Sequence, residues 1–422
     1  MTESLRRTLR HPAAHLILLS LTLALEYVVV RRLIAARGLV PELQSTLAAA
    51  QAAWRAGSFP QTALYPPLLP AMAIALQWAG LPLPDPWLFN LAAAWAGMLV
   101  LYGLARRALG APLPAFAVGL LALLNPYALW TFLLSRDAAL EFVFGGLMLW
   151  AVVSALRREA EDRRAAGMAL LGLLVAIALG FTRVTGFFVA AAAFLIALAL
   201  SRTAALRRGW ALALLGLAAS GLLLCTFNLR QVGAFRLATN GGYNLYLGNH
   251  PAYLHAHPHY DVDVFLGPVA QAEGFGTLPE AERDQAYTRR AIDFMKADPA
   301  AFGLRLVLKS AWHWFNLEKI PNYTSLSLLA PDGQTALLAP IDVLPGLAYA
   351  LYKLLYLPLL AATLVFIATR RLERHLYVLI APLLGLWPVV ALTFPDTRFK
   401  IDAELLALPA MMAAWMTWRS KR

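Results

Sequence analysis

A few carboxylates at the ends of long apolar runs are the residues best suited to catalysis. Glu42 follows the first apolar run and Asp137 lies at the end of another. Acidic residues are scarce in this chain, and two carboxylates that reach one cleft can act as a general base and as a metal or hydrogen-bond partner. We therefore take Glu42 and Asp137 as candidate catalytic residues. Asp85, just before an apolar run, is expected to be a solvated acid.

Four basic residues also stand near the ends of apolar runs. A guanidinium group makes bidentate, charge-assisted contacts with phosphate oxygens. Each of these residues alone is typical of a membrane headgroup anchor, but together they predict a site for a phosphate group. The residues are Arg183, Arg230, Arg398 and Lys400.

Several histidines in a proline-rich stretch raise the question of a metal ion. Their spacing matches no zinc-binding pattern, and the prolines predict an irregular loop, so the sequence predicts no firm metal site. A divalent cation such as Mg²⁺ or Mn²⁺ would find better candidate ligands in Glu42 and Asp137. The histidines concerned are His255, His257 and His259.

The composition shows what kind of protein must position these residues. Of the 422 residues, 60% are apolar and 14% are charged, whereas soluble domains average about 45–50% and about 25%. This excludes a soluble globular enzyme and a disordered chain. The single cysteine, Cys225, excludes an intramolecular disulfide framework.

Ten apolar runs approach the roughly 20 residues that a helix needs to cross a bilayer. An eleventh stretch, 65–80, is shorter and opens with two prolines. We predict ten transmembrane helices, with 65–80 not crossing. The runs cover about 13–34, 86–105, 112–133, 137–156, 166–182, 184–201, 209–227, 342–368, 376–394 and 402–418.

Basic clusters orient this bundle. If 65–80 does not cross and the N-terminus is cytoplasmic, nearly every basic loop falls on the cytoplasmic side, as the positive-inside rule requires. Both termini are then expected in the cytoplasm, and the candidate site residues on the outer face. The net charge of +12 follows mostly from this topology, so nucleic acid is not an expected partner.

The topology divides the chain into three parts. Residues 1–228 form an N-terminal transmembrane module whose first outer loop is 35–85, residues 229–341 form an outer-face segment, and residues 342–422 form the last transmembrane helices. The predicted fold is an all-α polytopic membrane protein with interfacial helices and a small outer α(+β) segment.

Local signals predict elements within the outer segment. Thr277-Leu278-Pro279-Glu280 is typical of a capping box that opens a helix towards Ala297. Asp298-Pro299 opens a second helix with cations on one face and apolar residues on another, which suits either the membrane interface or packing on the outer segment. Asn240-Gly241-Gly242 predicts a β-hairpin turn between 235–239 and 243–247.

Several motifs resemble those of a known family. Glu42, Gly57 and Tyr65-Pro66-Pro67-Leu68 resemble the first outer loop of the polytopic C-type glycosyltransferases. The nearest group is glycosyltransferase family 39, which includes dolichyl-phosphate-mannose protein mannosyltransferases and bacterial aminoarabinose transferases acting on lipid A. The likeness covers nearly the whole chain in the same order. The further matches are Ser135-Arg136-Asp137, Phe181-Thr182-Arg183, Asn228-Leu229-Arg230, the segment 239–249 and Thr397-Arg398-Phe399.

The resemblance implies an enzyme of the bacterial cytoplasmic membrane with its active site facing the periplasm. Such an enzyme transfers a hexosyl or pentosyl group, with inversion, from a polyprenyl-phosphate carrier to a lipid, glycan or protein acceptor. By this likeness Glu42 stands at the position of the catalytic aspartate. Leu43 replaces the acid that usually follows. Tyr65 replaces a His or Lys that faces the donor phosphate, so it would contribute a hydrogen bond without charge.

Two other function classes fit part of this pattern. One is a flippase or transporter of a lipid-linked sugar, and the other is a polymerase or ligase that joins lipid-linked glycans. Transporters tend to place charged sites near the bilayer midplane in repeated halves, whereas the polar groups here are expected at one face and no halves repeat. Glu26, inside the first run, is interpreted as part of a buried structural pair with a neighbouring arginine.

Overall fold

A computed structural model describes the protein over residues 11–36, 38–60, 62–64, 66–256, 262–315, 340–395 and 397–420. Within these ranges every regular element is an α-helix or a short 3₁₀-helix. The all-α class is therefore confirmed for the described residues. The small β component expected in 229–341 is absent from the described part of that segment.

Seven helices are long and apolar enough to cross a membrane. The number becomes eight if α6 (Pro112–Leu123) and α7 (Pro126–Leu134), which meet at a bend of 67°, form one broken span. The protein is thus a helical bundle of membrane-protein character. The seven are α2 (Pro12–Ala36), α5 (Pro86–Leu109), α8 (Ala138–Arg157), α9 (Asp162–Thr182), α11 (Ala204–Val232), α17 (Pro340–Ala368) and η2 (Arg374–Ile380) continued by α18 (Ala381–Leu392).

Two of the ten predicted spans match neither these seven helices nor the broken pair of α6 and α7. α10 (Thr185–Leu200) has 16 residues, or about 24 Å of helix. α19 (Thr397–Arg419) carries Lys400, Asp402 and Glu404 in its first two turns. Both helices pack within the bundle, α10 against α9 and α11 and α19 against α17 and α18. Ten spans therefore remain a prediction.

The short apolar stretch near residue 70 forms α4 (Leu68–Trp78). Its 11 residues give about 16 Å of helix, roughly half the thickness of a bilayer core. α4 packs against α3 (Leu43–Arg55), and the two share a small core that includes Leu43, Leu47 and Leu69. The structure therefore agrees with the prediction that this stretch does not cross.

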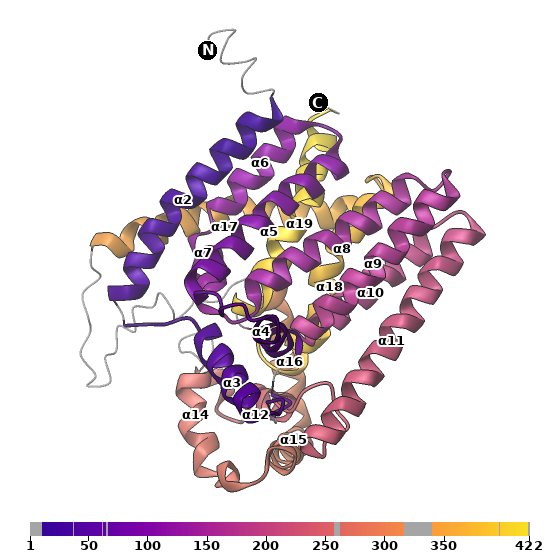
Figure 1. The fold of residues 1–422 in the computed structure, drawn as a ribbon. Helices are drawn as coiled ribbons and strands as arrows, with labels where there is room; N and C mark the ends of the chain where they lie inside the picture. Colours follow the sequence, from indigo (N-terminus) through magenta and orange to yellow (C-terminus); the bar gives the residue numbers. More distant parts are fainter. Residues whose placement is uncertain are drawn as a thin grey trace.

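Several helices gather at one end of the bundle, and we call α3 and α12–α15 the extramembrane layer (Figure 1). The start of α2 and the end of α19 lie at the opposite end of the bundle (Figure 1). The layer's helices α12–α15 share an apolar core, which includes Tyr246, Leu266, Tyr287 and Ala291. Its later helices are α12 (Gly241–Asn249), α13 (Tyr253–Ala256), α14 (Val262–Ala272) and α15 (Glu280–Ala297).

The predicted β-hairpin around Asn240 is wrong, because Gly241–Asn249 is the helix α12. The second of the two glycines, Gly242, serves close packing rather than a turn. The backbone N–H of Gly242 donates to Asp284 Oδ1 of α15 at 2.6 Å. A Cβ at Gly242 would collide with the backbone oxygen of Asp284. Glycine therefore allows α12 to approach α15 closely.

The two helices predicted in the outer segment are confirmed, with one change at a start. α16 (Pro299–Phe315) begins as predicted, since Asp298 Oδ1 accepts the N–H of Ala301 at 2.9 Å. α15 begins at Glu280 and not at Thr277. The Glu280 carboxylate accepts the N–H of Ala63 at 2.7 Å instead of closing a capping box. It thereby ties α15 to the loop before α4.

Candidate functional site

Two loops meet where the bundle borders the extramembrane layer. The first leads from α2 into α3, and the second, 135–137, joins α7 to α8. The N–H of Glu42 donates to the carbonyl of Leu134 at 2.8 Å. The buried amide of Asn90, on α5, donates to the carbonyls of Leu133 and Ser135 at 2.9 and 3.2 Å. These bonds hold Glu42 beside the loop that carries Asp137.

The side chain of Glu42 is accessible and has a cationic neighbour. Arg136 Nη2 lies 3.8 Å from Glu42 Oε2, and 47% of the Glu42 side chain is exposed against 12% for Arg136. A carboxylate that is open to solvent and paired only at this distance can still accept a proton from a substrate hydroxyl. Next to this pair, Ser135 Oγ donates to Asp137 Oδ1 at 3.1 Å.

A buried ion pair lies behind Asp137. Arg183, between α9 and α10, donates to Glu141 Oε2 of α8 at 2.6 Å, and Thr185 Oγ1 donates to Glu141 Oε1 at 3.0 Å. Desolvation alone would lower the pKa of Arg183, but the carboxylates of Glu141, Asp137 and Asp402 raise it above its ordinary value. Arg183 therefore stays charged among three acids.

The structure thus brings Glu42, Asp137 and Arg183 to one region, linked by Arg136 and Glu141. Glu141 is not among the residues that the sequence pattern predicted for the site. The sequence could have indicated Glu141, because it is an acidic residue in the first turn of an otherwise apolar helix. A carboxylate buried at such a position needs a partner.

The other predicted phosphate ligands have different surroundings. Lys400 is fully buried and donates to the carbonyl of Trp312 at 3.0 Å. Arg230 is exposed at the end of α11, and the described contacts do not join it to Glu42. Arg398 lies in the first turn of α19, but its side chain is outside the described residues, as is Tyr65. Arg183, by contrast, lies in the region of Glu42 and is bonded to Glu141. A phosphate-binding role for all five residues stays a prediction.

The described residues offer no metal site, since no group of three or more His, Cys, Asp or Glu side chains gathers among them. His255 is exposed at the end of α13, and His257 and His259 lie outside the described residues. Glu42 has the guanidinium of Arg136 as its charged neighbour.

Polar groups also lie within the bundle, contrary to the expectation that they collect at one face. Lys353 of α17 donates to Glu404 Oε2 of α19 at 2.8 Å, and its ammonium lies near the rings of Tyr349, Tyr352 and Tyr356. This pair is buried. The attraction between the two charges and the cation–π contacts with the tyrosine rings stabilise this pair among apolar helices.

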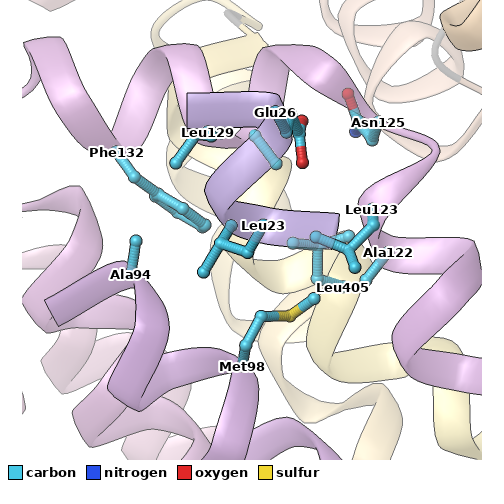
Figure 2. Close-up of a pocket in the computed structure, with 11 residues that line it drawn as sticks. Leu23, Glu26, Ala94, Met98, Ala122, Leu123, Asn125, Leu129, Phe132 and Leu405 are labelled. Carbon is cyan, nitrogen blue, oxygen red and sulfur yellow. The ribbon is translucent and has the colours of Figure 1, made fainter. Parts of the chain in front are cut away.

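A small pocket of about 20 Å³, room for one water molecule, lies beside the break between α6 and α7. Figure 2 shows the carboxylate of Glu26 and the amide of Asn125 towards one side of it. Glu26 Oε1 is buried and has no hydrogen-bond partner among the described residues. No described arginine pairs with it, so the predicted pairing is wrong for the part of the chain described. The other walls are mostly apolar: Leu23, Ala94, Met98, Leu129, Phe132 and Leu405.

A comparison of the chain with protein-family profiles, with curated proteins and with solved structures finds no match.

Proposed function

We propose that the protein is a membrane glycosyltransferase that moves a sugar from a polyprenyl-phosphate carrier to an acceptor hydroxyl or amine. The observation that carries this proposal is the cluster at the boundary of bundle and layer. There an accessible carboxylate, Glu42, lies close to Arg136 and Asp137, with the buried Glu141–Arg183 pair behind them. An acid–base group beside cations at headgroup depth suits a lipid phosphate donor.

The proposed reaction is a single in-line displacement. The acceptor oxygen or nitrogen attacks the anomeric carbon, and its proton passes to the Glu42 carboxylate. The bond between the anomeric carbon and the phosphate oxygen breaks, and its electron pair leaves with the polyprenyl phosphate. Arginine side chains stabilise the charge on that leaving group, and Asp137 orients the acceptor. One displacement inverts the configuration of the sugar.

The arrangement favours a lipid carrier over a nucleotide sugar. The chain has no phosphate-binding loop of the Walker or dinucleotide type. The apolar helices offer an environment for an isoprenoid tail, and the extramembrane layer lies at the same end as Glu42 (Figure 1). In this proposal the acceptor is a lipid, glycan or protein, and the site faces the periplasm from a bacterial cytoplasmic membrane.

The test is turnover by purified protein with a polyprenyl-phosphate sugar. Glu42→Gln should abolish release of polyprenyl phosphate while retaining the fold and donor binding, because glutamine keeps the shape but cannot accept the proton. Glu282→Gln is the matched control, an exposed acid in the first turn of α15, and should keep wild-type turnover. Turnover retained by Glu42→Gln would refute the role of Glu42. Release of a polyprenyl diphosphate would indicate a polymerase or ligase instead.

One observation favours the alternative of a lipid-linked sugar transporter. The 67° break between α6 and α7 lies beside the pocket of Glu26, and broken helices with ionisable residues inside the bilayer are typical of transport sites. In liposomes, a transporter would move the labelled donor across the bilayer without releasing polyprenyl phosphate. Glu26→Gln would then impair movement, and Glu42→Gln would not.

A further inference from the structure

Helix α16 has its charged and apolar faces reversed relative to a helix on a water-exposed surface. Arg305, Lys309 and His313 recur every fourth residue and are only 4%, 0% and 1% exposed. The opposite face carries the apolar side chains, and 52% of Leu304, 65% of Val307 and 44% of Phe315 are exposed. In water this arrangement would be unfavourable, because it buries polar side chains and exposes apolar ones to solvent. The exposed face therefore calls for an apolar environment.

The inward polar side chains attach α16 to the bundle. The Lys309 ammonium donates to the carbonyls of Gly248 at 3.1 Å and Thr393 at 2.8 Å, which lie at the C-terminal ends of α12 and α18. A cation at the end of a helix satisfies its unpaired carbonyls and its dipole. Further along, His313 Nε2 lies 2.9 Å from the carbonyl of Leu383 in α18. The polar face is thus used for packing and is not exposed.

The contacts with α18 also give the direction of α16. Lys309 meets Thr393 at the end of α18, whereas His313, one turn further along α16, meets Leu383, ten residues earlier in the chain. The end of α18 adjoins the extramembrane layer, because the Asn249 amide of α12 donates to the carbonyl of Leu392 at 2.8 Å. α16 therefore descends from the layer alongside α18, a candidate membrane span.

The apolar face of α16 continues a surface of α18. The rings of Trp314 and Trp387 are 6.0 Å apart in an edge-to-face contact. Trp387 is exposed on α18, and so are Leu384 and Leu392 of the same helix. The exposed face of a membrane span contacts lipid acyl chains. The apolar face of α16 adjoins that face of α18 through Trp314 and Trp387, so it should contact acyl chains as well. Tryptophan is also enriched at the edge of the bilayer.

We propose that α16 is embedded in the leaflet next to the extramembrane layer, with the face formed by Leu304, Val307 and Phe315 in contact with phospholipid acyl chains. The helix does not cross the bilayer. α16 is then a membrane-embedded helix in addition to the candidate spans. Because it leads directly from α15, it also sets how close the extramembrane layer lies to the membrane. The inference does not depend on the proposed transferase activity.

The test measures where labels on α16 reside. In a Cys225→Ser background, Leu304→Cys, Val307→Cys and Phe315→Cys each receive a nitroxide, and the protein is reconstituted into phosphatidylethanolamine–phosphatidylglycerol liposomes. Power-saturation EPR then compares accessibility to oxygen, which concentrates in lipid, with accessibility to nickel–EDDA, which stays in water. Gln285→Cys, at an exposed position of α15, is the matched control.

Labels on α16 should be several-fold more accessible to oxygen relative to nickel–EDDA than the label at position 285. The ratio should increase from position 304 to position 315, as the helix descends. Nickel–EDDA accessibility equal to that at 285 would overturn the proposal, because the face would then meet water. Low accessibility to both reagents would also overturn it, because a protein partner or a second copy would then cover the face. The three positions report independently, so one misfolded variant does not decide the outcome.

Discussion

Glu141 and Arg183 illustrate how single charged residues are stabilised at the border of the bundle. Their side chains come from α8 and from the turn before α10, and they bond at 2.6 Å with little exposure. Burying either charge alone costs several kcal/mol, whereas the bonded pair largely offsets that cost. Asp137 and Asp402 add negative charge around Arg183. Arg183 is therefore held in place before any substrate arrives.

Breaking this pair should destabilise the fold strongly. Glu141→Leu leaves the Arg183 guanidinium buried without its closest carboxylate, and we expect a loss of about 3–5 kcal/mol in the free energy of unfolding. Arg183→Met should cost a similar amount, and the double variant should recover much of the loss. Thermal unfolding in detergent measures all three.

An exposed pair supplies the control for that cycle. Glu161 and Arg164 bond at 2.8 Å on the surface, and Glu161→Gln should change the free energy of unfolding by less than about 1 kcal/mol. If Glu141→Leu lowered the free energy of unfolding no more than Glu161→Gln does, the buried Glu141–Arg183 pair would not stabilise the fold.

At the scale of elements, the junction of α12, α16 and α18 joins the extramembrane layer to the bundle. Gly248 lies against the backbone of Thr393, and a Cβ there would collide with the carbonyl of Thr393. The same carbonyl accepts from Lys309. The close approach of two helix ends therefore depends on a residue without a side chain.

Gly248→Ala should separate these helix ends. We expect a loss of about 1–3 kcal/mol in the free energy of unfolding, the usual cost of overpacking. Gly241→Ala is the control in the same helix, because a Cβ at Gly241 meets nothing within 4 Å. It should be neutral or slightly stabilising. Equal effects of the two substitutions in thermal unfolding would contradict the close approach.

The extramembrane layer should also lose stability in acid through His250. Burial lowers the pKa of His250; Glu273 raises it, and Arg290 and Arg305 lower it further. The neutral ring accepts the N–H of Ala252 at Nδ1, at 3.1 Å. As pH falls below about 6.5, the unfolded chain binds a proton that the folded protein does not, so the free energy of unfolding decreases.

His250→Asn should remove this part of the pH dependence, because the asparagine oxygen can accept the same N–H without titrating. Melting temperatures of both proteins between pH 7.5 and about 5 test this. An unchanged pH profile in the variant would show that other groups control the acid response.

At the scale of the whole molecule, the arrangement places both ends of the described chain opposite the extramembrane layer (Figure 1). This agrees with the predicted topology, in which the termini are cytoplasmic and the layer lies outside. The expected orientation rests on the positive-inside rule. The structure shows which elements share an end of the bundle, and the charges predict the compartment that this end faces.

Labelling of single cysteines in intact cells tests this topology. In a Cys225→Ser background, a membrane-impermeant maleimide should label Gln285→Cys on α15 without permeabilisation. It should label Arg163→Cys, exposed at the start of α9, only after permeabilisation. The reverse pattern would invert the topology and move Glu42 to the cytoplasmic side.

Much of the architecture follows from local properties of the chain. Apolar runs predicted where the long helices lie, because the cost of burying backbone and charge in lipid acts on each segment separately. The starts of α15 and α16 were predicted to within a few residues by their caps. Glu42, Asp137 and Arg183 were predicted as site residues because each interrupts or follows an apolar run, and their roles stay predictions.

Pairing was decided only by the tertiary structure. Glu141 and Arg183 are 42 residues apart, and α16 packs on α18 with 70 residues between His313 and Leu383. The chain positions that predicted a hairpin at Gly241-Gly242 form a helix, in which Gly242 lies against Asp284 of α15. Local hydropathy determines which segments are buried away from water. Which charge meets which, and which face of a helix turns inward, depends on contacts between segments that no local pattern encodes.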